Sequence, residues 1–151
     1  MQPIQIDRAG EEDREWTAAL LAGSEPWITL GVTIAMCRAA CCNSEYLVYV
    51  ARCEGKRCGA IVLHPRGLAG SPYIKSIALE EGFRGRGFGA QLMDFAEELF
   101  RSESRNIFLC VSSFNTRARA FYERRGYRAV GELADYLIEG ASEIIMCKRL
   151  R

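Results

Sequence analysis

The spacing of hydrophobic and polar positions along this chain changes from one segment to the next. Alternation of apolar and polar residues is typical of a half-buried strand, and apolar residues three or four apart are typical of a helix with one buried face. By these rules we expect strands at residues 4–8, 46–52, 58–63, 73–79, 107–111, 127–133 and 143–148. We expect helices at residues 11–21, 27–42, 88–101 and 115–124.

The order of these segments, β-α-α-β-β-β-α-β-α-β-β, predicts an α/β fold with a mixed sheet. No repeat, linker or low-complexity run divides the chain, so we expect residues 1–151 to form a single domain. The strand, helix and strand between residues 73 and 111 predict one parallel crossover in a sheet that hairpins otherwise connect. Residues 53–57 suit a hairpin turn, and residues 65–72 suit a loop.

Several side chains have expected places within these elements. The helix at 88–101 should turn one apolar stripe toward the core, formed by Phe88, Leu92, Phe95, Ala96 and Leu99. The continuous apolar run at 107–111 indicates a strand buried on both faces. We expect Ser24 to cap the second helix and Asn115 the last one, with Gly126 ending that last helix in a left-handed conformation.

The charges nearly balance, with 20 Lys and Arg against 19 Asp and Glu. Such a chain has no basic field of the kind that holds nucleic acid. The weakly polar stretch 27–42 is shorter than the ~20 apolar residues that a membrane span requires. The first residues also lack the basic and apolar regions of a signal sequence. We therefore expect a cytoplasmic protein that binds neither nucleic acid nor a membrane.

The seven cysteines are an odd number, and a chain of this length can bury a core without disulfides. Cys53 and Cys58 stand five positions apart with only His64 nearby, which is not the paired spacing of zinc sites. The sequence therefore predicts buried free thiols and no metal site.

The segment from Leu79 to Ala90 has the strongest chemical signal. It lies between a predicted strand and a predicted helix, and it contains four glycines. Glycine lets the backbone turn sharply and approach a ligand closely. Free amides at a helix N-terminus, with Arg84 and Arg86 beside them, form an anion site. We therefore expect a ligand that carries phosphate.

Two known phosphate-binding patterns fit this segment poorly. It contains no Gly-x-x-x-x-Gly-Lys-Ser/Thr sequence, which excludes a P-loop. Residues 85–90 match the dinucleotide pattern Gly-x-Gly-x-x-Gly/Ala, but five residues separate Leu79 from the first glycine of that match. The next strand, 107–111, ends without the carboxylate that would bind a ribose. A nicotinamide or flavin enzyme is therefore not indicated.

The same loop resembles that of the Gcn5-related N-acetyltransferase (GNAT) family. Arg84-x-x-Gly87-x-Gly89 is similar to the family's Arg/Gln-x-x-Gly-x-Gly/Ala loop, which grips the pyrophosphate of coenzyme A. Residues 76–79 resemble the strand that precedes this loop. Residues 115–127 resemble the family's second motif, Asn-x-x-Ala-x-x-Phe-Tyr-x-x-x-Gly-Phe/Tyr. Both motifs stand in the family's order and spacing.

The resemblance implies a GNAT-like sheet whose parallel crossover holds acetyl-CoA. It implies an N-acetyltransferase that moves an acetyl group directly to a primary amine of a small molecule, a peptide or a protein N-terminus. By the same resemblance, Tyr122 is the catalytic acid that protonates the departing thiolate, and the N–H of Leu79 polarises the thioester carbonyl. The implied cofactor-binding residues are Ile77, Ala78, Leu79, Arg84, Gly85, Arg86, Gly87, Phe88, Gly89, Ala90 and Asn115.

The general base stays open among Glu80, Glu81, water and none. An α-amine with a pKa of ~8 is already neutral in roughly a tenth of its molecules at pH 7, so it hardly needs a strong base. Acetyltransferases of ribosomal-protein N-termini resemble this chain but have Glu where Cys110 stands. We do not expect Cys110 to carry the acyl group, because its apolar strand should raise the thiol pKa.

The acceptor amine should contact the first two helices and the loops at 65–72 and 131–142. A noncatalytic acyl-CoA-binding or regulatory module on the same fold is the alternative function. The presence of Tyr122 favours the enzyme. We expect a monomer or a homodimer.

Overall fold

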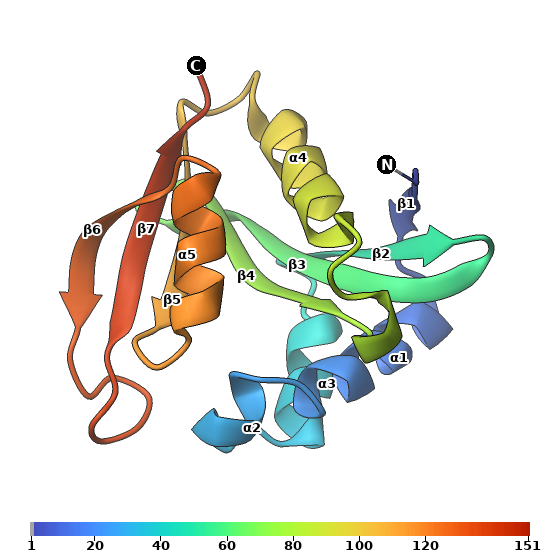
Figure 1. The fold of residues 1–151 in the computed structure, drawn as a ribbon, viewed down its shortest axis with the longest axis horizontal. Coiled ribbons are helices and arrows are strands. Elements are labelled where there is room, and N and C mark those ends of the chain that lie inside the picture. The colour runs from blue at the N-terminus through green and yellow to red at the C-terminus, as the bar shows by residue number, and fades with distance from the viewer. Residues whose placement is uncertain (1) are drawn as a thin grey trace.

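Seven strands form one sheet in the order β1-β2-β3-β4-β5-β7-β6 in the computed structural model, which describes residues 2–151 (Figure 1). The strands are β1 (Gln5–Arg8), β2 (Leu47–Cys53), β3 (Lys56–Leu68), β4 (Ser71–Leu79), β5 (Asn106–Ser112), β6 (Arg128–Leu133) and β7 (Glu143–Arg149). The helices are α1 (Glu11–Ala22), α2 (Trp27–Leu30), α3 (Ile34–Cys41), α4 (Phe88–Phe100) and α5 (Thr116–Arg124), with a 3₁₀ turn, η1 (Glu81–Phe83), before α4. Within the described residues only β4 and β5 pair in parallel, which confirms the predicted mixed sheet with one crossover.

Helices cover both faces of this sheet, and each face has its own core (Figure 1). On one face, α4 and α5 pack over a cluster that includes Ile61, Leu92 and Leu109. On the other, α1 and α3 pack over a cluster that includes Val50 and Val62. Neighbouring residues of a strand point to opposite faces, so β3 supplies Ile61 to one core and Val62 to the other.

The prediction of one helix over residues 27–42 is wrong, because the structure divides that stretch into α2 and α3. Gly31 ends α2 with a left-handed φ of 71°. The Thr33 hydroxyl starts α3 by accepting a hydrogen bond from the N–H three residues on, at 3.2 Å. Ser24 caps neither helix, since its hydroxyl donates to the carbonyl oxygen of Leu20 at 2.6 Å. The glycine that ends α2 and the new cap that begins α3 therefore outweigh the weakly polar character of the whole stretch.

Residues 65–72 are also not the predicted loop. Strands β3 and β4 continue into this stretch and turn at residues 69–70. The register between the two strands is irregular from His64 to Leu68. Pro65 lies in that irregular stretch, where its missing N–H costs no ladder hydrogen bond.

Helix α4 buries a broader face than the predicted stripe. Phe88, Leu92 and Ala96 are fully buried, whereas Phe95 and Leu99 are only partly buried. The residues that extend the buried face are Met93, Glu97 and Phe100. An amphipathic helix that packs against a twisted sheet contacts it over more than one narrow row of side chains.

Strand β5 is fully buried on one face only, so the prediction of burial on both faces is wrong. Ile107, Leu109 and Val111 are buried, while Phe108 and Cys110 remain partly exposed. On the side of Phe108 and Cys110, helix α1 packs over β2 and β4. The second face of β5 is therefore left partly open.

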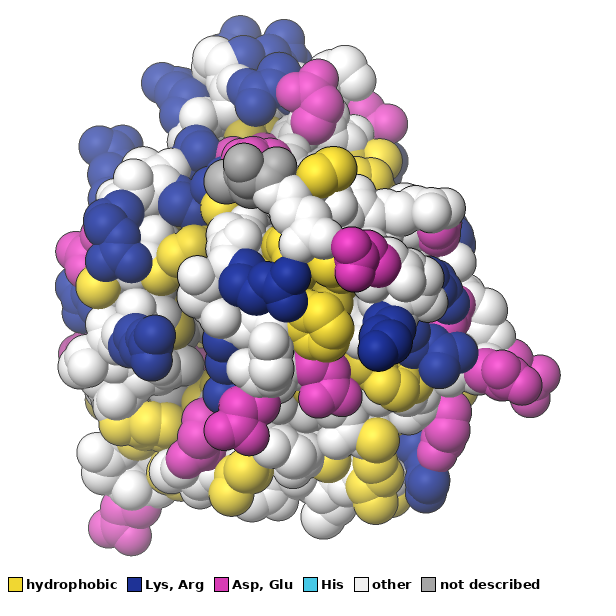
Figure 2. Space-filling view, turned by 45° about the vertical axis from the view of Figure 1, so that its right-hand side comes forward, with side chains coloured by type: hydrophobic (Ala, Val, Ile, Leu, Met, Phe, Trp, Pro, Cys, Tyr) yellow, Lys and Arg dark blue, Asp and Glu magenta, His cyan; other side chains and the backbone are white. Residues whose placement is uncertain are grey.

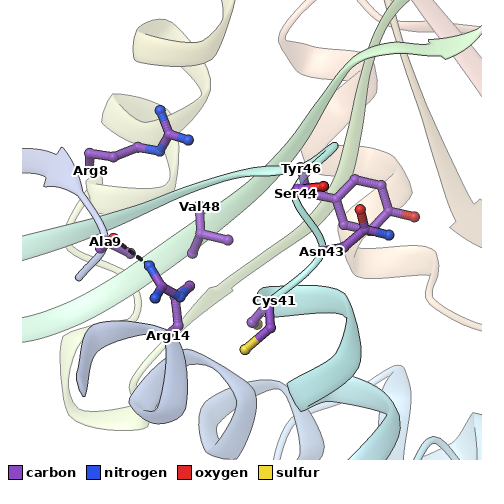
Figure 3. Close-up of a pocket in the computed structure, with 9 residues that line it drawn as sticks. Arg8, Ala9, Arg14, Cys41, Asn43, Ser44, Tyr46 and Val48 are labelled. Carbon is purple, nitrogen blue, oxygen red and sulfur yellow. Dashed lines mark hydrogen bonds between the residues drawn. The ribbon is translucent and has the colours of Figure 1, made fainter. Parts of the chain in front are cut away.

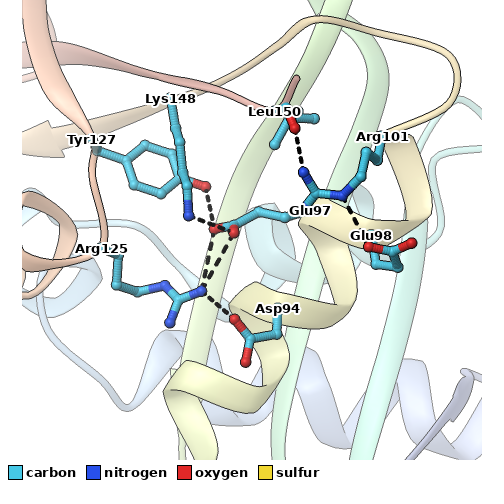
Figure 4. Close-up of polar contacts among 8 residues, drawn as sticks. All are labelled: Asp94, Glu97, Glu98, Arg101, Arg125, Tyr127, Lys148 and Leu150. Atoms are coloured by element: carbon cyan, nitrogen blue, oxygen red, sulfur yellow. Dashed lines mark hydrogen bonds and ion pairs between the residues drawn. The ribbon is translucent and has the colours of Figure 1, made fainter.

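Glu97 of α4 is the centre of a buried ion cluster (Figure 4). The residue is 3% exposed, and its carboxylate accepts hydrogen bonds from the Tyr127 hydroxyl at 3.0 Å and the Lys148 ammonium at 2.7 Å. The Arg125 guanidinium lies 3.4 Å from each carboxylate oxygen and also pairs with Asp94. Burial, the Glu97 charge and this hydrogen bond raise the pKa of the Tyr127 phenol, so it remains a donor. The cluster ties α4 to β7 and to the end of α5.

The surface carries charges of both signs. On the face in Figure 2, Lys and Arg side chains lie among Asp and Glu side chains. Among the described residues, no helix has the length and apolar character needed to span a membrane.

Candidate functional site

Strands β4 and β5 pair over a short stretch and then separate. Their parallel ladder joins only residues 73 and 74 of β4 to residues 108 and 109 of β5. We call the unpaired ends, residues 75–79 of β4 and 110–112 of β5, the splay. In Figure 1, β4 and β5 diverge at this place.

A β-bulge in β4 accounts for the separation. In the ladder with β3, Val62 pairs with Ser76 and Leu63 pairs with Ile74, which leaves Lys75 without an opposite residue. An extra residue of this kind bends its strand and increases the local twist. β4 therefore turns away from β5 immediately after their last pair.

The β4 side of the splay offers backbone groups that β3 does not use. The N–H of Glu80 donates to the carbonyl oxygen of Cys58 in β3 at 2.8 Å. Because hydrogen-bonded and free pairs alternate along an antiparallel ladder, Ala78 also bonds to β3. Ile77 and Leu79 then direct their N–H and C=O groups toward β5. Two of the three predicted strand residues thus face the splay, and Ala78 does not.

The β5 side follows the same rule. The N–H of Ser113 donates to the carbonyl oxygen of Ser142 at 2.8 Å, next to β7. The alternation then directs the backbone groups of Cys110 and Ser112 away from β7 and toward β4. An extended ligand in the splay would find hydrogen-bonding partners on both strands.

The glycine loop ends at an uncapped helix N-terminus. Gly85 and Gly87 have left-handed φ angles of 74° and 83°. A residue with a side chain would be strained in this conformation. Gly87 is the N-cap of α4 and has no side chain to cap it. The first N–H of this helix to bond within it is that of Gln91, and none of the hydrogen bonds found within residues 2–151 uses the N–H groups of residues 88–90. These three donors and the helix dipole make the N-terminus of α4 a candidate anion site.

The two predicted arginines flank this anion site. The Nε of Arg84 donates to the carbonyl oxygen of Leu79 at 3.3 Å. The Arg86 guanidinium lies 5.1 Å from the ring centroid of Phe88 and donates to the side chain of Gln2 at 2.7 Å. Both arginines are exposed and retain further N–H donors for an anion. Phe88 is fully buried, so only its backbone can face a ligand.

Helix α5 lies beside this loop. Asn115 caps α5 by accepting a hydrogen bond from the N–H of Ala118 at 3.4 Å, and Gly126 follows the helix with the predicted left-handed φ, here 94°. Phe121 packs against the start of α4, since a Cβ built on Gly89 would lie 3.7 Å from the Phe121 ring. The predicted loop residues and the predicted α5 motif therefore come together in space.

Tyr122 combines a buried ring with an accessible hydroxyl. The residue is 8% exposed and belongs to the core beneath α4 and α5. Its hydroxyl makes no hydrogen bond within residues 2–151. The one fully buried side-chain N or O atom without a partner in that range is Nε of Arg125, so the Tyr122 hydroxyl must reach accessible surface. Burial raises the pKa of this phenol to about 12, which keeps it protonated.

The candidate bases and the candidate nucleophile occupy different parts of the site. Glu80 and Glu81 lie where β4 meets η1, at the end next to the glycine loop. Cys110 lies at the other end, immediately past the last β4–β5 pair. Burial raises the pKa of the Cys110 thiol, as the sequence predicts.

The sequence reasoning missed three polar residues on the face of the splay opposite α5. The Ser112 hydroxyl donates to the Glu143 carboxylate at 2.6 Å, and both residues are buried. Burial raises the pKa of the Tyr73 phenol, and Cys110 and Glu143 raise it further. No local pattern could bring these side chains together, because the register of β5 on β7 places Ser112 opposite Glu143.

Two surface hollows lie away from the splay. One is formed by α1, the end of α3 and β2, where Arg14 donates to the carbonyl oxygen of Ala9 at 3.1 Å (Figure 3). The other surrounds Asp13, which pairs with Arg52 at 2.6 Å and Arg57 at 2.8 Å. Neither hollow is lined by a residue predicted to bind the cofactor or to act in catalysis. The backbone geometry of the splay and loop identifies the candidate site better than these hollows do.

The cysteines are free thiols throughout residues 2–151, as the sequence predicts. The fully buried ones are Cys37, Cys41, Cys53 and Cys58. Cys110 and Cys147 are only partly buried and Cys42 is exposed, so the prediction of burial is wrong for these three. In the same part of the chain, no three His, Cys, Asp or Glu side chains gather as metal ligands.

A sequence profile of the acetyltransferase (GNAT) family matches residues 12–127. An uncharacterized N-acetyltransferase of Methanocaldococcus jannaschii is 33% identical over 103 residues, which are 67% of this chain and 65% of that protein. The match therefore spans slightly less than two thirds of that relative's length.

Solved structures of the same family share the fold. A GNAT-family protein from Desulfovibrio desulfuricans has a TM-score of 0.81 and 18% identity, with 99% of this chain and 100% of that chain covered. A GNAT-family acetyltransferase from Elizabethkingia anophelis, solved with acetyl-CoA bound, has a TM-score of 0.73 and 17% identity, with 97% of each chain covered. At such low identity the likeness concerns the fold alone.

Proposed function

Because the chain belongs to the acetyltransferase (GNAT) family, we propose that it moves an acetyl group from acetyl-CoA to a primary amine by direct transfer in a ternary complex. The observation that carries this proposal is a splay between β4 and β5 that leads to the uncapped N-terminus of α4. The pantetheine arm of acetyl-CoA contains amides, and its far end carries phosphates. The segment from β4 to the start of α4 offers hydrogen-bonding groups to both the pantetheine amides and the phosphates.

In this proposal the N–H groups of residues 88–90 bind the pyrophosphate. Arg84 and Arg86 add charge-assisted hydrogen bonds from outside the helix. The backbone of Ile77 and the C=O of Leu79 pair with the pantetheine amides, as an additional strand would. Ala78 supports the site through its side chain, which packs in the core beneath α1 and α3.

The glycines allow the phosphates to approach the amides. Gly85 and Gly87 adopt the left-handed conformation that turns the loop, and Gly89 and Ala90 place little side-chain bulk at the first turn of α4. Asn115 acts indirectly, because its cap sets where α5 begins and hence where Tyr122 lies.

Two groups of the chain assist the chemistry. The N–H of Leu79 donates to the thioester carbonyl oxygen and stabilises the negative charge that develops there. The Tyr122 hydroxyl gives its proton to the departing thiolate. Burial raises the pKa of Tyr122, and a thiolate in the same surroundings also holds a proton more tightly than in water. The surroundings therefore raise the pKa of both the Tyr122 phenol and the departing thiol.

Direct transfer is favoured over an acyl-enzyme route through Cys110. Burial raises the pKa of that thiol, so little of it is the nucleophilic thiolate near neutral pH. We further propose that residues 1–151 act as one acetyltransferase domain, as a monomer or a homodimer. All seven strands belong to one sheet, which supports this assignment.

Release of free CoA thiol from acetyl-CoA, measured across a panel of primary amines, tests the proposed function. The panel contains amino acids, polyamines, amino sugars and peptides with a free N-terminus. We expect thiol release that requires both the protein and one class of amine, with the two-substrate kinetics of a ternary complex. CoA binding by calorimetry without transfer to any amine would identify a noncatalytic acyl-CoA-binding module instead.

A further inference from the structure

Glu143 is a buried carboxylate that lies beside the splay. It begins β7 and pairs with Ser112 of β5. Val111 and Ile144, the residues next to this pair, point into the core beneath α4 and α5. The side chains of Ser112 and Glu143 therefore lie on the opposite face of the sheet. Glu143 is 8% exposed, and a carboxylate buried to this extent is costly unless a partner binds it.

Only one oxygen of this carboxylate has a partner in the protein. Oε2 accepts the hydrogen bond from the Ser112 hydroxyl at 2.6 Å. Oε1 accepts none within residues 2–151, yet it is not among the fully buried orphans, because Nε of Arg125 is the one such atom there. Oε1 therefore touches accessible surface and is free to accept a hydrogen bond from a ligand.

The negative charge of Glu143 also lacks a cation. None of the ion pairs found within residues 2–151 includes this carboxylate. This sets Glu143 apart from Glu97 and Asp13, the other buried carboxylates, which both pair with cationic side chains. A cationic ligand would complete the site.

Two groups that the Glu143 charge influences, Tyr73 and Cys110, are themselves uncharged. Burial raises the pKa of the Tyr73 phenol and the Cys110 thiol, and the Glu143 charge raises both further. Tyr136, from the loop between β6 and β7, also acts on Tyr73 and is 64% exposed. Neither Tyr73 nor Cys110 therefore supplies the cation that the Glu143 carboxylate lacks.

This carboxylate and Tyr122 lie on opposite faces of the sheet. Cys110 is the first residue of β5 beyond the last pair with β4, and Ser112 follows about 7 Å further along the strand. Tyr122 packs in the core of the other face, beneath α5. A paired sheet separates its two faces, whereas a splay lets groups from both faces reach the same atoms.

Resting on the proposed function, we propose that Glu143 binds the ammonium form of the acceptor amine through Oε1 and removes its proton. Ser112 positions the carboxylate by holding Oε2. The acceptor therefore belongs to the amines that are cationic at neutral pH, and it approaches from the face of Tyr73. This assigns the general base that the sequence leaves open among Glu80, Glu81, water and none.

The protons and electron pairs of the reaction balance. Glu143 takes one proton from the ammonium group, and the nitrogen lone pair then forms the C–N bond as the C–S bond breaks. The departing thiolate takes the proton of Tyr122. The second proton lost by the nitrogen restores the Tyr122 phenol, and Glu143 releases its own proton to solvent. The net products are the acetylated amine, CoA thiol and one proton.

Glu143→Gln tests the assignment, because the amide keeps the shape and a hydrogen bond to Ser112 but loses the charge. The probes are the best cationic amine of the panel and hydroxylamine, which is neutral at pH 7 and needs no base. We expect kcat/KM for the cationic amine to fall by about 10²–10⁴, with little change for hydroxylamine or for CoA affinity. Glu103→Gln is the matched control, since Glu103 is an exposed carboxylate in the turn between α4 and β5, at the opposite end of β5 from Ser112, and should change neither rate.

The outcomes separate this assignment from the proposed function. An equal loss with both probes, or no loss with either, would overturn the role of Glu143 and leave the acetyltransferase intact. A parent protein that binds CoA and transfers to no amine would refute both. If Glu143→Gln does not fold, Glu143→Ala is assayed with added formate: recovery of transfer to the cationic amine supports the base, and no recovery counts against it.

Discussion

Tyr122→Phe and Tyr127→Phe form a matched pair that separates catalysis from packing. The two rings are buried in the same core, with their centroids 6.0 Å apart. Each substitution keeps the ring and removes one hydroxyl. The Tyr127 hydroxyl donates to the Glu97 carboxylate at 3.0 Å, whereas the Tyr122 hydroxyl has no partner within residues 2–151. We therefore expect opposite effects on stability and on turnover.

The magnitudes follow from these contacts. Tyr127→Phe removes a buried hydrogen bond to a charged group, which should cost about 1.5–3 kcal/mol of unfolding free energy. For a chain of this size that lowers Tm by about 3–12 °C. Tyr122→Phe removes no hydrogen bond, so its cost should stay within about 0.5 kcal/mol. Its kcat should fall by about 10²–10⁴, or about 2.7–5.5 kcal/mol of barrier, if the hydroxyl protonates the thiolate.

Steady-state kinetics and thermal melts on the same preparations test the expected effects on turnover and on stability. Replacing CoA by an acyl donor whose thiol is a better leaving group should rescue Tyr122→Phe more than the parent, because that thiolate needs less help from an acid. Since the pKa of Tyr122 is about 12, activity of the parent should show no loss of this acid below about pH 11. Near-normal kcat in a destabilised Tyr122→Phe protein would refute the catalytic assignment.

Three further substitutions test the cofactor site and the scaffold. Gly87→Val should abolish CoA binding in calorimetry. Gly55→Val, on a turn with a similar φ of 81°, should strain the backbone equally and leave CoA affinity unchanged. Equal CoA affinities of the two variants would refute the assignment of the cofactor site to this loop. Arg84→Ala should weaken CoA binding by about 1.5–3 kcal/mol at low salt and by less at high salt, and a loss independent of salt would exclude a phosphate contact. Burial alone would raise the pKa of Asp13, but a backbone N–H and two arginines outweigh it and hold the pKa below its usual 3.8. Asp13→Asn should therefore destabilise the fold by about 1.5–3 kcal/mol at pH 7, and melts should show the difference from the parent shrinking as the pH falls below 3.8.

Local chemistry made much of the candidate cofactor site predictable. Gly85 and Gly87 turn the chain because glycine alone adopts a positive φ without strain, and this preference is readable at single positions. Asn115 caps α5 and Gly126 follows it in the left-handed conformation for similarly local reasons. The order of the strands was predictable as well, because the period of the apolar pattern depends only on neighbouring residues.

The wrong predictions of secondary structure lie where two local sequence patterns indicate different structures. The weakly polar stretch from 27 to 42, although broken by Gly31 and Arg38, suggested one helix, and the backbone shows that Gly31 ends one helix and Thr33 starts another. Pro65 suggested a loop, but an irregular register with β4 accommodates it inside β3. Such choices depend on packing against other parts of the chain.

The sequence by itself determined the order of the strands, the single parallel crossover and the glycine loop that begins α4, because these follow from properties of residues close together in the chain. Tertiary structure alone decided that a bulge at Lys75 opens the splay and that Glu143 lies beside it without a cation. The same holds for the burial of Glu97 among its three cationic and phenolic partners. Register and alternation across strands set these contacts, and both relate residues that are distant in sequence.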